Sequence, residues 1–179
     1  MKSSIKISAV AIILWVQIQA YSQRSPIEIS GDVVQIALPV SALASTYFYQ
    51  ADDKPHWQFL KTYALANLIT HGLKPLINET RPNGGQHSFP SGHTTSAFAG
   101  AAFLQMRYGW KIGIPAYLLA SYVGFTRIYA KKHFIWDVAA GAVIGIGSAM
   151  IFTKKYPSGY ESGMNYSNGF YMIGINYNF

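Results

Sequence analysis

KPLINETRP at residues 74–82, PSGH at 90–93 and TRIYAKKHFIWD at 126–137 are the stretches that decide the interpretation of this 179-residue chain. They supply cations, two imidazoles, a carboxylate and a Ser-Gly turn, in an order suited to the transfer of a phosphoryl group. Such a group carries negative charge on its equatorial oxygens, so positioned cations and backbone N–H donors do most of the catalytic work. The candidate residues are Lys74, Arg81, Ser91, Gly92, His93, Arg127, His133 and Asp137.

The cations and the Ser-Gly turn each have a chemical reason to bind phosphate. The planar guanidinium of Arg81 or Arg127 matches two phosphate oxygens at once, while lysine acts as a point charge. Ser91 precedes an apolar run at 94–106 that is typical of a helix, so we expect Ser91 to be its N-cap. Gly92 then lets the backbone come close to a ligand, and the N–H groups of the first turn face an anion.

His133 and Asp137 are four residues apart, which places them on one face if that segment is helical. Asp137 can then hold the imidazole in one tautomer, and an oriented neutral histidine is a good nucleophile or base. Each of these residues alone has an ordinary structural interpretation, such as a helix cap or an interfacial charge. In a chain with few charged residues, three ordered motifs together favour phosphate chemistry.

These motifs resemble those of the type 2 phosphatidic acid phosphatase superfamily, which also includes class A acid phosphatases and vanadium haloperoxidases. The family pattern is K-x6-R-P, then P-S-G-H, then S-R-x5-H-x3-D, and the resemblance covers about residues 74–152. One position departs from the pattern, because Thr126 stands where the family usually has serine. Threonine keeps the hydroxyl group, so we expect little loss.

The resemblance implies a role for each motif residue. His133 would attack phosphorus and form a phosphohistidine, with Asp137 orienting it, and His93 would protonate the leaving oxygen. The phosphate would be held by Lys74, Arg81, Ser91, Gly92 and Arg127. The implied enzyme is a metal-independent phosphoric monoester or diphosphate hydrolase without a cofactor, and the motifs agree, since they offer a single carboxylate, too few oxygens for magnesium or calcium.

The composition favours an all-α integral membrane bundle of five or six transmembrane helices. Half of the residues are hydrophobic and 12% are charged, against about 25% charged in a typical soluble domain. Apolar segments recur at 9–20, 33–51, 57–73, 94–106, 112–126 and 138–153. The segment 33–51 has no charge and approaches the ~20 residues that span a bilayer. The other segments are shorter and the mean hydropathy is +0.15, so a soluble helical phosphatase stays as the alternative.

The placement of basic residues predicts the orientation in the membrane. By the positive-inside rule, Arg107, Lys111, Lys154 and Lys155 mark the cytoplasmic face. All three motifs then lie at the opposite face, which would be the periplasmic or outer face of a bacterial inner membrane. Nucleic acid is not an expected partner despite the net charge of +7, because the basic residues gather at the motifs and segment boundaries.

The chain divides into three predicted parts. Residues 1–22 have the character of a signal peptide or of a first transmembrane helix, and 23–155 form the phosphatidic acid phosphatase-like membrane domain. The tail at 156–179 is rich in Gly, Asn and Tyr and has β-like content around the turn signal Asn168-Gly169; it has no assigned role. With no cysteine, the chain has no disulfide chemistry.

The expected substrate is a lipid phosphate or pyrophosphate monoester. Phosphatidic acid, phosphatidylglycerol phosphate, undecaprenyl pyrophosphate and a lipid A phosphate all fit, and the segments 31–50 and 57–73 carry no recognisable headgroup code. Three alternatives stand beside this hypothesis: a soluble periplasmic acid phosphatase of the same superfamily, a vanadate-dependent haloperoxidase and a non-catalytic protein that binds anionic lipid. No oligomeric state is predicted.

Overall fold

A computed structural model describes residues 24–48, 54–156, 160–167 and 170–177. Within these residues the chain forms helices α2 (Pro26–Phe48), α3 (Pro55–Ile77), α4 (Gly92–Tyr108), α5 (Trp110–Tyr129) and α6 (Ile135–Phe152), followed by strands β1 (Tyr160–Ser167) and β2 (Phe170–Tyr177). Each predicted apolar segment from residue 33 onward corresponds to one helix. The predicted segment at 9–20, with its alternatives of signal peptide or first membrane helix, lies outside the described residues.

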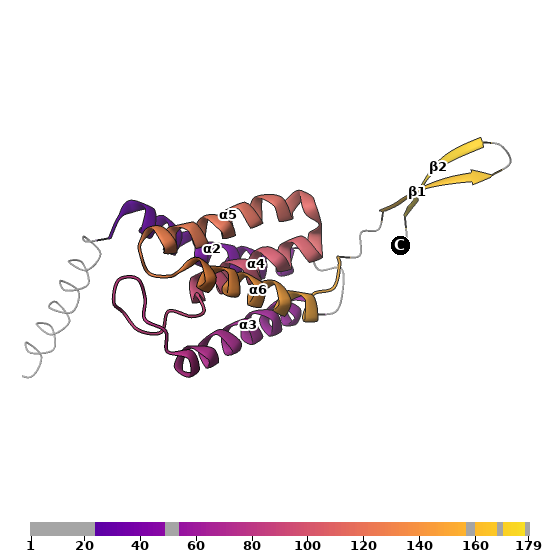
Figure 1. Cartoon of the computed structure of the whole chain (residues 1–179). Coiled ribbons are helices and arrows are strands. Elements are labelled where there is room, and N and C mark those ends of the chain that lie inside the picture. The colour runs from indigo at the N-terminus through magenta and orange to yellow at the C-terminus, as the bar shows by residue number, and fades with distance from the viewer. Residues whose placement is uncertain (1–23, 49–53, 157–159, 168–169, 178–179) are drawn as a thin grey trace, which may run out of the picture.

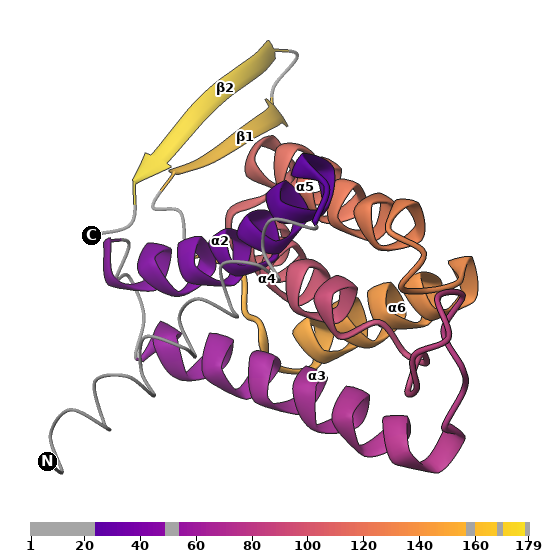
Figure 2. The same cartoon turned by 90° about the vertical axis from the view of Figure 1, so that its left-hand side faces the viewer.

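Helix α4 is the centre of the bundle and contacts α2, α3, α5 and α6. Figure 1 shows the helices running along a common long direction, and Figure 2 shows α4 surrounded by the others. Small side chains make this central position possible. Gly100 is needed because a Cβ there would lie 2.9 Å from the backbone carbon of Leu38 in α2. The backbones of α2 and α4 therefore approach closely, as is common between membrane helices.

The bundle buries small residues and exposes large apolar ones. The core of α4 is largely alanine, and the outward faces of α2, α5 and α6 carry large exposed side chains. Examples with more than half of their area exposed are Val33, Ile36, Val40, Ile114, Leu118, Val143, Met150 and Ile151. Exposed apolar surface on this scale indicates contact with an apolar environment or a partner.

Two helices, α2 and α6, are long and apolar enough to cross a membrane by length and composition. Of the five described helices, two therefore agree with the prediction of five or six membrane helices. The others fall short for visible reasons. Helix α4 has 17 residues and is too short. Helices α3 and α5 are long enough but less apolar, and Lys61 and Lys74 in α3 and Lys111 and Arg127 in α5 contribute to this.

The tail forms an antiparallel hairpin, in which Tyr160 pairs with Tyr177 and Ser167 with Phe170. The prediction of an all-α bundle is therefore confirmed, and the tail, which was predicted separately, forms two strands. The β-like content of the tail and the turn signal Asn168-Gly169 indicated this outcome. Residues 168–169 themselves lie outside the described part of the chain.

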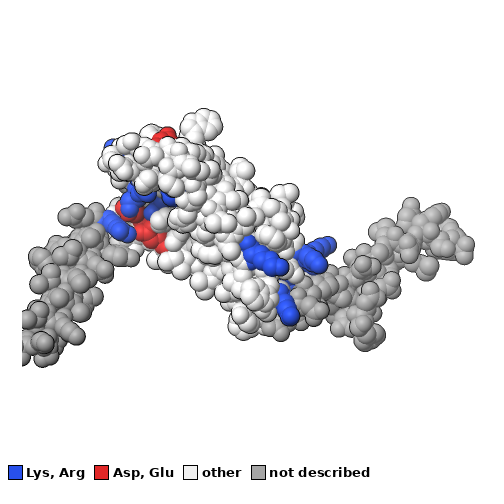
Figure 3. Space-filling view, turned by 90° about the horizontal axis from the view of Figure 1, so that it is seen from below, with Lys and Arg blue, Asp and Glu red and all other residues white. Residues whose placement is uncertain are grey.

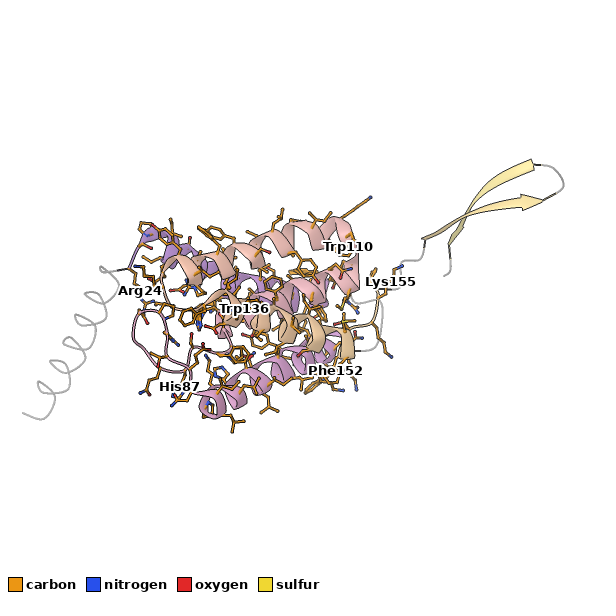
Figure 4. All side chains as sticks on the ribbon, viewed as in Figure 1. Arg24, His87, Trp110, Trp136, Phe152 and Lys155 are labelled. Carbon is orange, nitrogen blue, oxygen red and sulfur yellow. The ribbon has the colours of Figure 1, made fainter. Side chains whose placement is uncertain are left out.

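The two ends of the bundle differ in their loops and charges. Figure 4 places Arg24 and His87 at one end, and Trp110, Phe152 and Lys155 at the other. In the view of Figure 3, acidic side chains accompany the basic ones at the first end, the second end carries basic side chains, and an uncharged surface separates the two. All three sequence motifs converge at the first end, where the α3–α4 and α5–α6 connections meet.

Candidate functional site

A cavity of about 310 Å³ lies at the motif end of the bundle. Five of the eight predicted residues line it, namely Lys74, Arg81, Gly92, His93 and His133. They come from all three motifs, which are separated by up to 59 residues in the sequence. The fold thus brings together two of the three cations and both histidines, while Ser91, Arg127 and Asp137 do not line the cavity. Asp137 contacts His133, and Ser91 directly precedes Gly92.

His133 is held by Asp137 as the spacing suggested, although by a different local structure. The two are not on one helical face, because His133 lies before α6 and Asp137 lies in its first turn. The carboxylate points back past the helix start, so its Oδ2 lies 3.3 Å from Nδ1 of His133 and accepts from the N–H of Phe134 at 2.8 Å. Ser88 donates a third hydrogen bond to the same oxygen. With Nδ1 engaged, Nε2 is the nitrogen that remains for the cavity.

The environment of His133 keeps its imidazole neutral. Burial lowers the pKa of His133 from 6.5 to about 4, and the positive charges of Arg81 and Lys74 act in the same direction. The charge of Asp137 and its hydrogen bond oppose them without cancelling them. At neutral pH the ring is therefore uncharged, as an attacking nitrogen must be.

Lys74 and Arg81 reach the cavity from the end of α3 and the loop that follows it. Lys74 Nζ donates to the backbone oxygens of His87 and Pro90, both at 2.9 Å, and so ties α3 to the segment that leads into α4. Within the described residues, the Nε of Arg81 is buried without a hydrogen-bond partner. A buried guanidinium nitrogen with an unused donor is costly unless an anion accepts from it.

Ser91 is the N-cap of α4, which confirms the prediction. Its hydroxyl accepts from the Thr94 N–H at 3.4 Å and from the Thr94 hydroxyl at 2.9 Å. Its own N–H donates to the backbone oxygen of Asp137 at 3.0 Å, which joins the second motif to the third. Ser91 is fully buried, whereas Gly92 lines the cavity with the first helical turn, where free N–H groups and the helix dipole favour an anion.

Arg127 is buried and its guanidinium is occupied by protein acceptors. Nη1 donates to Oδ1 of Asp32 at 2.7 Å, and Nη2 donates to the backbone oxygen of Glu28 at 2.9 Å. Nε and Nη2 both donate to the Thr126 hydroxyl at 3.1 Å. The threonine that departs from the family pattern therefore orients Arg127. The resemblance implies a contact between Arg127 and the substrate phosphate. For this contact to form, a phosphate oxygen would have to replace one of these protein acceptors.

Several residues around the site have no counterpart in the three motifs. The cavity is also lined by Gln35, Tyr63, Asn67, His71 and Ser96. A sequence signal existed for those on α3, because residues 63, 67, 71 and 74 recur at helical spacing and so share the face of the motif lysine. Asp32 had a weaker signal, as a carboxylate next to a long uncharged segment. Among the described residues, no group of three or more His, Asp or Glu side chains is arranged to hold a metal ion.

Comparison with known proteins agrees with this geometry. The sequence pattern of the PAP2 superfamily matches residues 55–159. The chain is 33% identical over 109 residues to a lipid A 4'-phosphatase of Helicobacter pylori, which covers 52% of this chain, and 32% identical over 125 residues to a lipid A 1-phosphatase of Porphyromonas gingivalis, which covers 64%. It spans 55% and 28% of the lengths of these two relatives.

Two solved structures share the fold. LpxE of Aquifex aeolicus superposes with a TM-score of 0.61 at 25% identity, over 73% of this chain and 87% of that one. A transmembrane PAP2-type phosphatidylglycerolphosphate phosphatase of Bacillus subtilis superposes with a TM-score of 0.57 at 22% identity, over 81% and 84%. The family pattern covers more than half of the chain and includes every motif residue that meets at the cavity, so the chain belongs to the PAP2 superfamily.

Proposed function

We propose that this protein is a membrane phosphatase that hydrolyses a lipid phosphate or pyrophosphate monoester through a phosphohistidine intermediate. One observation carries the proposal. Lys74, Arg81, His93 and His133 line a single cavity, and this set supplies a nucleophile, an acid and two cations. The buried, unpartnered Nε of Arg81 marks the side of the cavity that an anion would complete. The family membership supports the same chemistry.

The geometry suggests how the reaction would proceed. Nε2 of neutral His133 attacks phosphorus, and the new N–P bond forms as the P–O bond to the lipid breaks. The leaving oxygen takes a proton from His93. Water then attacks the phosphohistidine and gives its proton to His93, the N–P bond breaks, and inorganic phosphate leaves. Throughout, Asp137 holds Nδ1 of His133, while the cations and the α4 N-terminus stabilise the charge on the transferred group.

The lipid character of the substrate is supported by the surface of the bundle. The large exposed apolar residues of α2, α5 and α6 suit a bilayer, and the curated relatives include lipid A phosphatases and a lipid phosphate phosphatase of Arabidopsis thaliana. We infer five or six spanning helices in a bacterial inner membrane, with the cavity at the periplasmic or outer face. The basic residues at the other end, including Arg107 and Lys155, support this orientation.

The test is phosphate release by the purified protein in detergent or vesicles. The substrate panel would contain phosphatidic acid, phosphatidylglycerol phosphate, undecaprenyl pyrophosphate and lipid A, and we expect release from at least one lipid. A lipid A phosphate is the first candidate, because two of the relatives carry that name. No release from any lipid, together with binding of the same lipids, would favour a non-catalytic role.

Activity assays with a chelator and with vanadate test the class of reaction. Activity should survive a strong chelator, since side-chain cations take the place of a metal, and vanadate should inhibit because it mimics pentacoordinate phosphorus. Loss of activity in chelator that magnesium restores would contradict the proposed mechanism. Halide oxidation by the vanadate-loaded protein would point instead to the haloperoxidase reaction.

A further inference from the structure

Asp32 joins three elements of the site although it belongs to none of the three motifs. It lies on α2, and its Oδ1 is 3.2 Å from Nε2 of His93 at the start of α4 and 2.7 Å from Nη1 of Arg127 near the end of α5. Its second oxygen, Oδ2, accepts from Nη1 of Arg24 at 3.1 Å. The Asp32 side chain is 16% exposed, so a partly buried carboxylate bridges His93, which lines the cavity, and Arg127, which does not.

The contact with His93 has a direct chemical consequence. A histidine that protonates a leaving group must carry its proton on the nitrogen that faces that group. With Nε2 on Asp32, the nitrogen left for the cavity is Nδ1. A carboxylate on one ring nitrogen fixes the orientation of the ring and favours its doubly protonated form. Burial and the positive charges of Arg127 and Lys132 act in the opposite direction at His93. This arrangement parallels the other histidine–carboxylate pair at the cavity, in which Asp137 holds Nδ1 of His133.

We propose that Asp32 is a positioning residue for His93, whose ring it orients so that Nδ1 can deliver a proton to the leaving oxygen. This inference rests on the phosphatase reaction proposed above. It adds to that reaction a second histidine–carboxylate pair, with one pair serving the attacking nitrogen and one serving the leaving group. The hydrogen bond from Arg127 to the same oxygen holds the Asp32 carboxylate in its position next to His93.

A neighbouring carboxylate on α2 provides the matched control. Glu28 lies one helical turn before Asp32, is 9% exposed, and pairs with Lys132 and with Arg24. Within the described residues its side chain has no ion pair or hydrogen bond with His93. Glu28→Gln therefore removes a buried charge from the same helix and the same ion network without touching the imidazole.

The experiment compares two substrates that differ in their need for an acid. An alkyl phosphate such as dioctanoyl phosphatidic acid has a poor leaving group, which needs a proton. The leaving group of p-nitrophenyl phosphate is a stabilised phenolate, which needs an acid much less. The quantity measured is kcat/KM, because it includes only the steps through release of the first product. In Asp32→Asn we expect a fall of roughly 10- to 100-fold for the alkyl phosphate and a clearly smaller fall for the aryl phosphate. The aryl-to-alkyl ratio should thus rise by about tenfold or more, whereas Glu28→Gln should leave it near the wild-type value.

A double mutant tests whether the effect acts through the imidazole. His93→Ala alone should raise the aryl-to-alkyl ratio, and adding Asp32→Asn should raise it no further. If Asp32→Asn does not fold, Asp32→Glu keeps the charge and displaces it by one methylene, and it should raise the ratio to a lesser degree.

Other outcomes separate this inference from the proposed function. Equal falls for both substrates would reduce Asp32 to a tether between helices, and a rise in both would make it a competitor for the phosphate position. Either result, or an unchanged ratio, overturns the inference. Wild-type protein that releases no phosphate from either substrate or from the lipid panel overturns the proposed function itself.

Discussion

His133 and Asp137 form a pair that is almost closed off from solvent, with 4% and 0% of their areas exposed. Among the described residues, His93 is also paired with a carboxylate, but Asp32 is more exposed than Asp137 and His93 is assigned to the leaving group, so we expect no substitute nucleophile. We expect His133→Ala to lower turnover by about 10⁴-fold or more while the protein stays folded, as judged by size exclusion and thermal unfolding in detergent. His56→Ala is the matched control, because His56 lies at the start of α3, far from the end of that helix where Lys74 reaches the cavity. Near wild-type activity in folded His133→Ala would refute the nucleophile assignment.

The charge state of His133 gives a second prediction at the residue scale. Because its pKa is lowered to about 4, the ring should stay neutral as pH falls through 6.5 and should take up a proton only near pH 4. NMR of histidine-labelled protein measures this directly, with His133→Ala identifying the resonance. Arg81→Gln removes a nearby positive charge and should move the midpoint upward. A wild-type midpoint near 6.5, or one insensitive to Arg81→Gln, would contradict the described environment.

At the scale of elements, the contact between α4 and α6 sets the distance between the second and third motifs. Gly145 of α6 packs against the α4 backbone, and a Cβ there would lie 2.7 Å from the nitrogen of Ala99 and from the oxygen of Thr95. Backbone atoms cannot move aside as a side chain can. We therefore expect Gly145→Ala to destabilise the protein by roughly 1–3 kcal/mol and to lower activity, measured as the shift in thermal unfolding and as phosphate release.

The same helix contains its own control. A Cβ at Gly147 would meet nothing within 4 Å, and alanine is the better helix former by up to about 1 kcal/mol. Gly147→Ala should therefore be neutral or slightly stabilising. Equal destabilisation by both substitutions would mean that helix propensity rather than the α4–α6 approach governs the effect.

At the scale of the whole molecule, the separation of the motif end from the basic end gives a topological prediction. Because the chain has no native cysteine, single cysteines can report on each end. Gln86→Cys lies in the exposed α3–α4 loop, and Trp110→Cys replaces a side chain that is 62% exposed at the other end. Gly109 is less suitable for a probe, because its φ of +87° strains any other residue. An impermeant thiol reagent should label Gln86→Cys on intact cells, once past any outer membrane, and Trp110→Cys only after lysis.

Two other labelling patterns would carry different conclusions. The reverse pattern would invert the protein and place the cavity on the cytoplasmic side, with a cytoplasmic pool of substrate. Labelling of both positions before lysis, in protein that fractionates without membranes, would favour the soluble phosphatase alternative.

The sequence by itself determined the family and the helices of this protein, and it carries the proposed chemistry as a prediction. Lys74, Arg81, His93 and His133 were identified from spacing and residue type, because phosphate binding requires particular donors in a particular order. The helices followed from apolar segments, and the cap at Ser91 from its position before one of them. These are local properties, set by residues near one another in the chain.

Tertiary structure alone decided which groups the motif residues meet. The partners of Arg127 and His93 come from α2, about 60 to 100 residues away in the sequence, and no local pattern encodes so distant a pairing. His133 meets Asp137 through a loop and a helix start, since a four-residue spacing permits contact by more than one backbone path. Asp32 had only a weak signal in the sequence, and its contacts with His93 and Arg127 are seen only in the fold, because packing brings the histidine and the arginine to it.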